Sequence, residues 1–135
     1  MSASTPGERH AIDAAHGFVA AHVKPNAQSW DRGLADSGSV LREAARAGLL
    51  GLEVPVEQGG QGLSFGCKRR VAEILAAADF GLAMSVINTH NVANHLARSA
   101  APELTRHVLP APLIEASAAL KASPGGCRSS SARAR

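Results

Sequence analysis

The sequence is poor in aromatic residues, and this shortage limits both what it can bind and how it can fold. Aromatic residues make up 3% of the 135 residues, tyrosine is absent, and Trp30 is the single tryptophan. A surface that stacks nucleic-acid bases needs such side chains, so the composition argues against one. Hydrophobic residues make up 45%, many of them alanine, which predicts one domain with a thin core.

Long apolar runs are also missing, and cysteines are few. No stretch of about eighteen apolar residues occurs, so no membrane-spanning helix and no membrane partner is predicted. Residues 1–10 carry no basic start followed by an apolar segment, and we therefore expect no signal peptide and a cytoplasmic location. Cys67 and Cys127 are expected to be reduced thiols rather than a disulfide.

Basic charge is concentrated near the C-terminus. The formal net charge is +3, yet residues 1–120 hold all eleven acidic residues and ten of the fourteen Lys and Arg. The last fifteen residues contain four basic side chains and no acidic one. Because the remainder is nearly neutral, it lacks the basic surface that binds phosphates, and no nucleic-acid partner is predicted.

Apolar residues recur at helical spacing in five segments, and none alternates as a strand does. The predicted helices cover about residues 5–24, 39–47, 64–80, 82–98 and 102–109. The residues between the first two predicted helices are polar and rich in turn formers, which predicts an ordered connection anchored by Trp30. The predicted fold class is all-α, a helical bundle of about five helices.

Local signals place the ends and faces of these helices. Ser64 can cap the third helix, whereas Gly48 and Gly81 are expected to end the second and third. In the third helix, the apolar spacing predicts Phe65 in the buried stripe and Lys68 on the side that faces water.

A glycine-rich segment, GLLGLEVPVEQGGQGLSF at residues 48–65, joins the second and third predicted helices. Gly59, Gly60 and Gly62 permit positive φ and sharp turns, while the leucines and Val54 are expected to hold the segment against the helices. We interpret the segment as structural. The alternative is a phosphate-binding loop, but the segment lacks the Gly-Lys-Ser/Thr of a P-loop and does not follow a strand.

The segment GLLGLEVP followed by VEQGGQG resembles the connection between the second and third helices of acyl-CoA dehydrogenases. FVAAHVKPNAQSWDRG resembles the end of the first helix of that family, RRVAEILAAADFGLAMSVINTHNVA its third and fourth helices, and APELTRHVLP its fifth. The resemblance holds in order over roughly residues 8–113. It implies an N-terminal helical domain of that family at residues 1–113 and an aberrant or disordered tail at residues 114–135.

The resemblance implies the α,β-desaturation of acyl-CoA thioesters, in which a glutamate removes the α proton and FAD accepts the β hydrogen as hydride. That glutamate and most flavin contacts belong to a sheet domain and a C-terminal helical domain that follow the fifth helix. The sequence departs from the family pattern after about residue 113, which suggests a truncation or a frame change. We therefore expect no catalytic residue, no retained FAD site and no activity for this chain alone.

The fourth helix of the family helps to form the wall around the fatty-acyl tail. The resemblance places Ser85, Ile87, Asn88 and Asn91 at this wall, as residues that bind substrate. In the alternative interpretation, Ile87 belongs to the core and the two asparagines are polar groups satisfied locally on a helix.

The histidines do not predict a metal site. His90 and His95 are five residues apart, and the spacing of six between His10, His16 and His22 also leaves them on different helix faces. No metal is therefore expected.

Two carboxylates and a thiol are further candidates for chemical roles. Glu53 and Glu57 could act as an acid and base pair, but solvation is the preferred interpretation. Lys68 could lower the pKa of the adjacent Cys67, although a small buried hydrophobic residue is preferred there.

A second function belongs to a different class. The chain could be a non-catalytic helical module that associates with other proteins, as a homo-oligomer or with a full-length homologue. Exposed apolar patches would be the sign of such a module.

Overall fold

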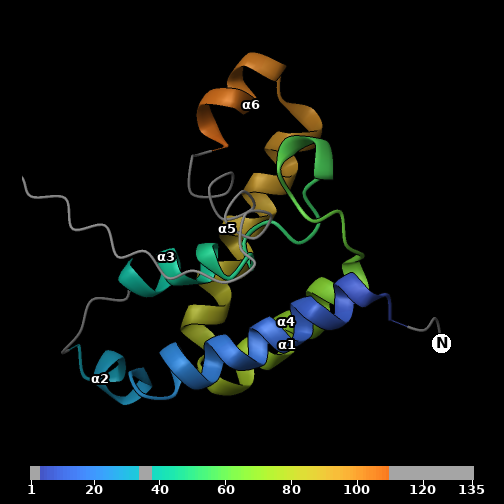
Figure 1. Cartoon of the computed structure of the whole chain (residues 1–135). Helices are drawn as coiled ribbons and strands as arrows, with labels where there is room; N and C mark the ends of the chain where they lie inside the picture. The colour runs from blue at the N-terminus through green and yellow to red at the C-terminus, as the bar shows by residue number, and fades with distance from the viewer. Residues whose placement is uncertain (1–3, 34–37, 110–135) are drawn as a thin grey trace, which may run out of the picture.

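The computed structural model describes residues 4–33 and 38–109 (Figure 1). Within these residues the chain forms helices and no strand, which confirms the all-α prediction. The elements are α1 (Pro6–Phe18), the π-helical η1 (Val19–Val23), α2 (Ala27–Asp31), α3 (Gly38–Arg46), the 3₁₀ turn η2 (Val56–Gln58), α4 (Phe65–Ala78), α5 (Phe80–Ser99) and α6 (Pro102–Val108). The predicted tail at residues 114–135 and its boundary lie outside the described residues.

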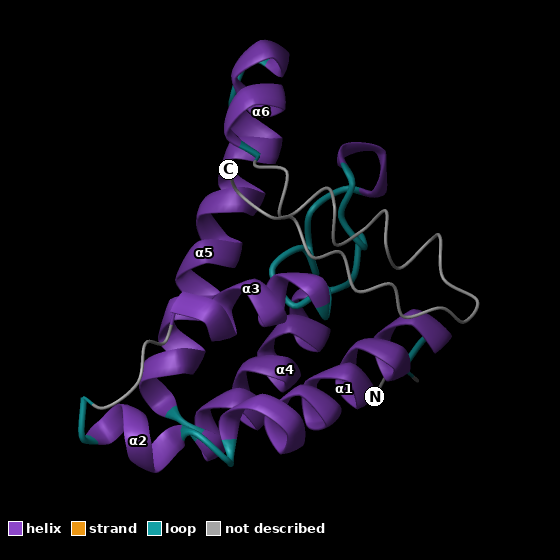
Figure 2. Cartoon of the chain, turned by 60° about the vertical axis from the view of Figure 1, so that its left-hand side comes forward, coloured by secondary structure: helices purple, strands orange, loops and turns teal. Residues whose placement is uncertain are grey.

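Two hydrophobic clusters hold the helices together. The larger joins α1, η1, α3, α4 and the first half of α5, and its largest fully buried side chains are Val23, Leu49, Leu52, Val71, Leu75 and Val86. The smaller consists of Val54, Ala93, Ala97 and Leu109, with Leu96 packed against it. Figures 1 and 2 show that α1 and α4 lie together, whereas α5 extends away from them to α6. The loop at residues 48–63 contributes to both clusters.

The N-termini of α1 and α4 lie side by side and share the carboxylate of Glu8. Thr5 accepts from the Glu8 N–H, and the Glu8 carboxylate accepts from the Thr5 N–H, which completes a capping box. Ser64 accepts from the Cys67 N–H, and its hydroxyl donates to the other oxygen of Glu8. The Ser64 hydroxyl, followed by the Thr5 N–H, holds the pKa of the Glu8 carboxyl below its usual value.

The break between α4 and α5 falls at Asp79, so the prediction that Gly81 ends the third helix is wrong. Asp79 is extended, with φ −158° and ψ 115°, and its carboxylate accepts from the Leu82 N–H at 2.7 Å. Gly81 lies inside the first turn of α5. An aspartate in this conformation starts a helix, because its side chain satisfies an N–H that the helix leaves unpaired.

Backbone hydrogen bonds hold the two halves of the loop at residues 48–63 together. Its returning half donates three N–H groups to its first half: Gln61 to Gly51 O at 2.9 Å, Gly62 to Val54 O at 2.9 Å, and Leu63 to Leu52 O at 2.7 Å. Gly59 has a φ of 89°, which a side chain disfavours. A Cβ at Gly60 would lie 2.0 Å from the carbonyl oxygen of Val54, so only glycine fits this crossing.

The polar connection after η1 contains a short helix, α2, that the sequence pattern did not predict. Trp30 lies on α2, is half-buried and packs against the larger cluster, as expected for its anchoring role. The α2 helix has no buried residue, so its apolar spacing gives no signal.

Candidate functional site

The four residues assigned to the substrate wall lie along the middle of α5. Ser85, Asn88 and Asn91 are exposed, and Ile87 is half-buried. At about 100° per residue, the four side chains follow one another over an arc of roughly 160° of the helix surface. We call this set, Ser85, Ile87, Asn88 and Asn91, the α5 arc. Its assignment to an acyl wall stays a prediction.

Ser85 and Asn91, the first and last residues of the α5 arc in the sequence, contact different neighbours. The Ser85 hydroxyl donates to the Gly81 carbonyl at 3.1 Å. Ser85 also lines a hollow of about 300 Å³ together with Trp30, Asp31, Leu41, Asp79, Gly81 and Leu82. Asn91 instead accepts a hydrogen bond from Lys68 of α4 at 3.1 Å. The side chain of Asn91 is therefore hydrogen-bonded to a residue of another helix, α4.

A polar cluster of Glu53, Lys68 and Asn91 lies where the loop crosses α4 and α5. The Lys68 Nζ is 2.6 Å from a carboxylate oxygen of Glu53, and the two side chains are 12% and 13% exposed. The same ammonium is 4.8 Å from the ring centroid of Phe65. The charge of Lys68 is therefore met by a carboxylate, an amide oxygen and an aromatic face.

Three sequence predictions fail at this Glu53–Lys68–Asn91 cluster. Lys68 and Glu53 do not face water, and Phe65, which was predicted to be buried, is 64% exposed. For the two charged residues the cause is the loop, which brings Glu53 against Lys68 of α4. Helical periodicity treats α4 in isolation, so it cannot predict which polar side a distant segment covers.

His90 is the residue at this junction that sequence reasoning missed. Its side chain is 0% exposed, and its Nε2 accepts from the Glu53 N–H at 3.1 Å. Its Nδ1 is buried and has no hydrogen-bond partner in the part of the chain that the structure describes. A signal was present, because His90 falls in the apolar stripe of α5, four residues after Val86 and three before Ala93.

The surroundings of His90 favour its neutral form. Burial lowers the pKa of the imidazole, the nearby ammonium of Lys68 lowers it further, and the Glu53 carboxylate and Asn91 amide act in the opposite direction. Within residues 4–33 and 38–109, no three His, Cys, Asp or Glu side chains are grouped so as to hold a metal ion. His90 is thus a buried hydrogen-bond acceptor.

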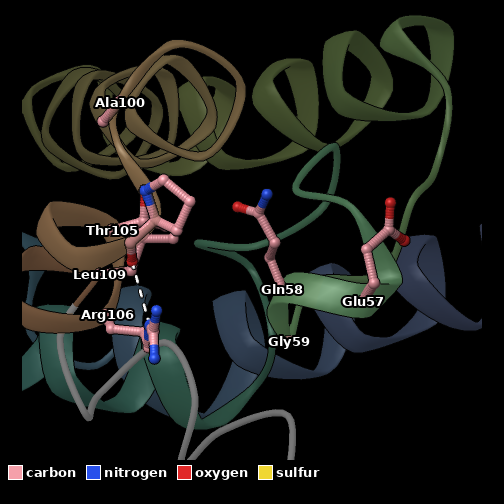
Figure 3. A pocket seen from close by; sticks show the side chains of 8 residues that line it. Glu57, Gln58, Gly59, Ala100, Thr105, Arg106 and Leu109 are labelled. Carbon is pink, nitrogen blue, oxygen red and sulfur yellow. Dashed lines mark hydrogen bonds between the residues drawn. The ribbon is translucent and has the colours of Figure 1, made fainter.

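A cavity of about 380 Å³ lies between η2 and α6, at the opposite end of α5 from Ser85 (Figure 3). Its lining consists of Glu57, Gln58, Gly59, Ala100, Pro102, Thr105, Arg106 and Leu109. Gln58 donates to the Ala97 carbonyl at 2.8 Å, and Arg106 donates from Nε to the Pro102 carbonyl at 3.3 Å. Thr105 also bonds within its helix, to Ala101 O at 3.1 Å. Gln58, Thr105 and Arg106 therefore each bond to a backbone carbonyl.

Comparison with known proteins decides the family. A family model described as the acyl-CoA dehydrogenase N-terminal domain matches residues 5–114. The chain belongs to this family. Searches of curated proteins and of solved structures give no significant match. Because the match spans every described helix, the loop and the α5 arc are parts of an acyl-CoA dehydrogenase N-terminal domain.

FAD, which the acyl-CoA dehydrogenase family implies, contains a pyrophosphate that helix N-termini bind well. In this domain, however, the Glu8 carboxylate accepts from the Thr5 N–H at the start of α1 and from the Ser64 hydroxyl at the start of α4, and the Asp79 carboxylate accepts from the Leu82 N–H at the start of α5. A second anion at either place would be repelled. These three helix ends therefore do not fit the pyrophosphate of the flavin.

Two further predictions can be compared with the described residues of the acyl-CoA dehydrogenase domain. Cys67 is a buried free thiol, and burial raises its pKa, in agreement with a small hydrophobic residue; Cys127 lies outside the described residues. None of the described helices is long and apolar enough to span a membrane.

Proposed function

We propose that this chain provides the N-terminal helical part of an FAD-dependent acyl-CoA dehydrogenase, which desaturates acyl-CoA thioesters between the α and β carbons. The observation that carries the proposal is the family match over residues 5–114. In this role the domain contributes a wall of the substrate site, and fatty-acid metabolism in the cytoplasm is the expected setting. The catalytic glutamate and the flavin come from other domains, so the 135-residue chain alone has no activity.

The exposed side chains of α5 fit a substrate that has an apolar part and a polar part. On the same side of the helix as the α5 arc, Met84 and Val92 are 43% and 61% exposed, next to the amide of Asn88. Because Lys68 can only donate, it fixes the oxygen of Asn91 toward itself and leaves the amide NH₂ free to donate outward. An acyl chain bearing a carbonyl-rich carrier offers both kinds of contact.

The activity of the isolated chain is the first test. The purified 135-residue chain is expected to be colourless and to give no dye reduction with acyl-CoA. Stoichiometric bound FAD, measured by its absorbance after purification, would contradict the assignment of the flavin site to other domains.

The role of α5 requires a complete enzyme. Residues 4–109 can replace the N-terminal domain of a full-length acyl-CoA dehydrogenase, and the chimera can be assayed by dye reduction with short and long acyl-CoA. Asn88→Trp should then lower kcat/KM by about tenfold or more for long chains, because the indole fills the space beside the wall. Arg69→Trp, at an exposed site on α4, is the matched control. Equal losses in both variants would exclude the α5 arc as the acyl wall.

A non-catalytic interaction module is the second candidate, because large apolar side chains are exposed. Phe80 is 69% exposed, Phe65 64% and Leu104 50%. Such residues could bind a second copy of the chain or a full-length homologue. Sedimentation velocity of the chain, alone and mixed with a complete acyl-CoA dehydrogenase, tests this function. A monomer that sediments independently of the enzyme at all concentrations would rule it out.

A further inference from the structure

Several charged side chains lie near the hydrogen bond between His90 and the loop. His90 belongs to α5, and its Nε2 accepts from the Glu53 N–H at 3.1 Å. On the loop, the Glu53 carboxylate pairs with Lys68 of α4, and the Glu53 carbonyl accepts a long hydrogen bond of 3.4 Å from Arg98 of α5. The α3 helix also contacts α5, but its ion pair of Glu43 and Arg46 lies near the surface.

The direction of this hydrogen bond determines where the proton of His90 lies. Since Nε2 accepts, the neutral ring carries its proton on Nδ1. A second proton can only be added at Nε2. That proton would point at the Glu53 N–H, so two donors would face each other and the hydrogen bond would be replaced by repulsion.

We propose that His90 is a pH-sensitive switch: protonation of its imidazole breaks the hydrogen bond to the Glu53 N–H and opens the loop at residues 52–54. The 0% exposure of His90 means that water cannot solvate the new charge while the loop is closed. Lys68 on α4 adds repulsion, whereas the Glu53 carboxylate, which is already paired with Lys68, and the Asn91 amide oppose it. Opening of the loop separates the two donors and lets water solvate the charged imidazole.

The lowered pKa of the buried imidazole agrees with this geometry. In the open loop the imidazole regains a pKa of about 6.5, whereas in the closed loop its pKa is lower. Protonation then favours the open form as the pH falls, by a factor of at most about 30 between about pH 7.5 and about pH 5. This inference does not depend on acyl-CoA or flavin, and it concerns a residue outside the α5 arc.

Amide hydrogen exchange of the 135-residue chain, followed by NMR, tests the switch. After correction for the intrinsic exchange rate, the protection of the Glu53 amide should fall severalfold, by at most about 30-fold, between about pH 7.5 and about pH 5. Amides in the middle of α4, such as that of Val71, should change much less. His90→Gln keeps a side-chain acceptor that cannot be protonated, so it should remove the pH dependence at Glu53.

His95→Gln is the matched control, because His95 is an exposed histidine on the same helix. It should retain the full pH dependence. If His90→Gln does not fold, the ¹⁵N shifts of the wild-type imidazole decide the question, since they report which ring nitrogen carries the proton. A proton on Nε2 at about pH 7.5, or equal Glu53 protection at the two pH values, would overturn the proposal.

Discussion

Removing one partner of the Glu53–Lys68 ion pair should destabilise the domain much more than removing both. The atoms are 2.6 Å apart and the two side chains are only 12% and 13% exposed, so each charge depends on the other for stabilisation. Breaking a fully buried pair costs about 3–5 kcal/mol, and the small remaining exposure reduces this to about 2–4 kcal/mol. Lys68→Met and Glu53→Gln should each lower the free energy of unfolding by this amount.

The double variant separates the charge effect from packing. In Lys68→Met combined with Glu53→Gln, no unpaired charge remains, so the loss should be at most about 1 kcal/mol. The coupling energy between the two sites, which is the sum of the two single losses minus the loss in the double variant, is then about 3 kcal/mol or more. The surface pair of Arg69 and Glu73 provides the control, because its side chains are 66% and 43% exposed. Arg69→Met should change the stability by about 0.5 kcal/mol or less.

Urea unfolding followed by circular dichroism measures these values. With a slope of about 1–1.5 kcal/mol per molar urea for a domain of this size, each single variant should move the midpoint down by roughly 2 M. The slope itself should not change, since the same surface is exposed on unfolding. Additive effects of the two substitutions, or single variants no weaker than Arg69→Met, would show that the pair does not stabilise the buried junction.

Two further predictions concern the loop and the paired helix ends. Gly60→Ala should cost about 3 kcal/mol in the same unfolding assay, since its Cβ would meet Val54 O at 2.0 Å. Gly17→Ala should instead gain about 0.5–1 kcal/mol, because Gly17 has nothing within 4 Å and lies inside the continuous helical run of α1 and η1. Equal effects of the two would refute the steric argument. Glu8→Gln should lower the melting temperature at neutral pH. The pKa of the Glu8 carboxyl is lowered in the folded state. The contribution of this carboxylate to stability is therefore present above the unfolded pKa near 4.5 and is lost as the pH falls through the folded value. A melting-temperature gap that persists at about pH 2 would contradict this role.

The helices could be predicted from the sequence because their ends depend on neighbouring residues. Thr5 and Ser64 cap α1 and α4 through N–H groups three residues away, and Gly48 adopts a φ of 79° at the end of α3. The sequence places the break before α5 at Gly81, because glycine is a common sign of a helix end, whereas the structure places it at Asp79. Asp79 shows that an available cap decides a boundary more strongly than a flexible residue two positions later.

The junction of the loop with α4 and α5 could not be predicted because its partners are far apart in the sequence. The Glu53 N–H meets His90 across 37 residues, and Gln58 meets the Ala97 carbonyl across 39. No helical or strand period relates such positions. Opposite charges at Glu53 and Lys68 were visible, but only the fold of the loop determines that they meet away from water.

The loop therefore connects stability to the proposed substrate wall. Lys68 bonds to Glu53 on the loop and to Asn91 on the α5 arc, so the position of the Asn91 amide depends on whether the loop is closed. His90 precedes Asn91 and holds the same loop residue through the Glu53 N–H. Since both contacts meet at Glu53, opening this short segment removes the partner of Lys68 and the constraint on Asn91 together. A glycine-rich loop without chemistry of its own can in this way determine the surface that a helix offers to a ligand.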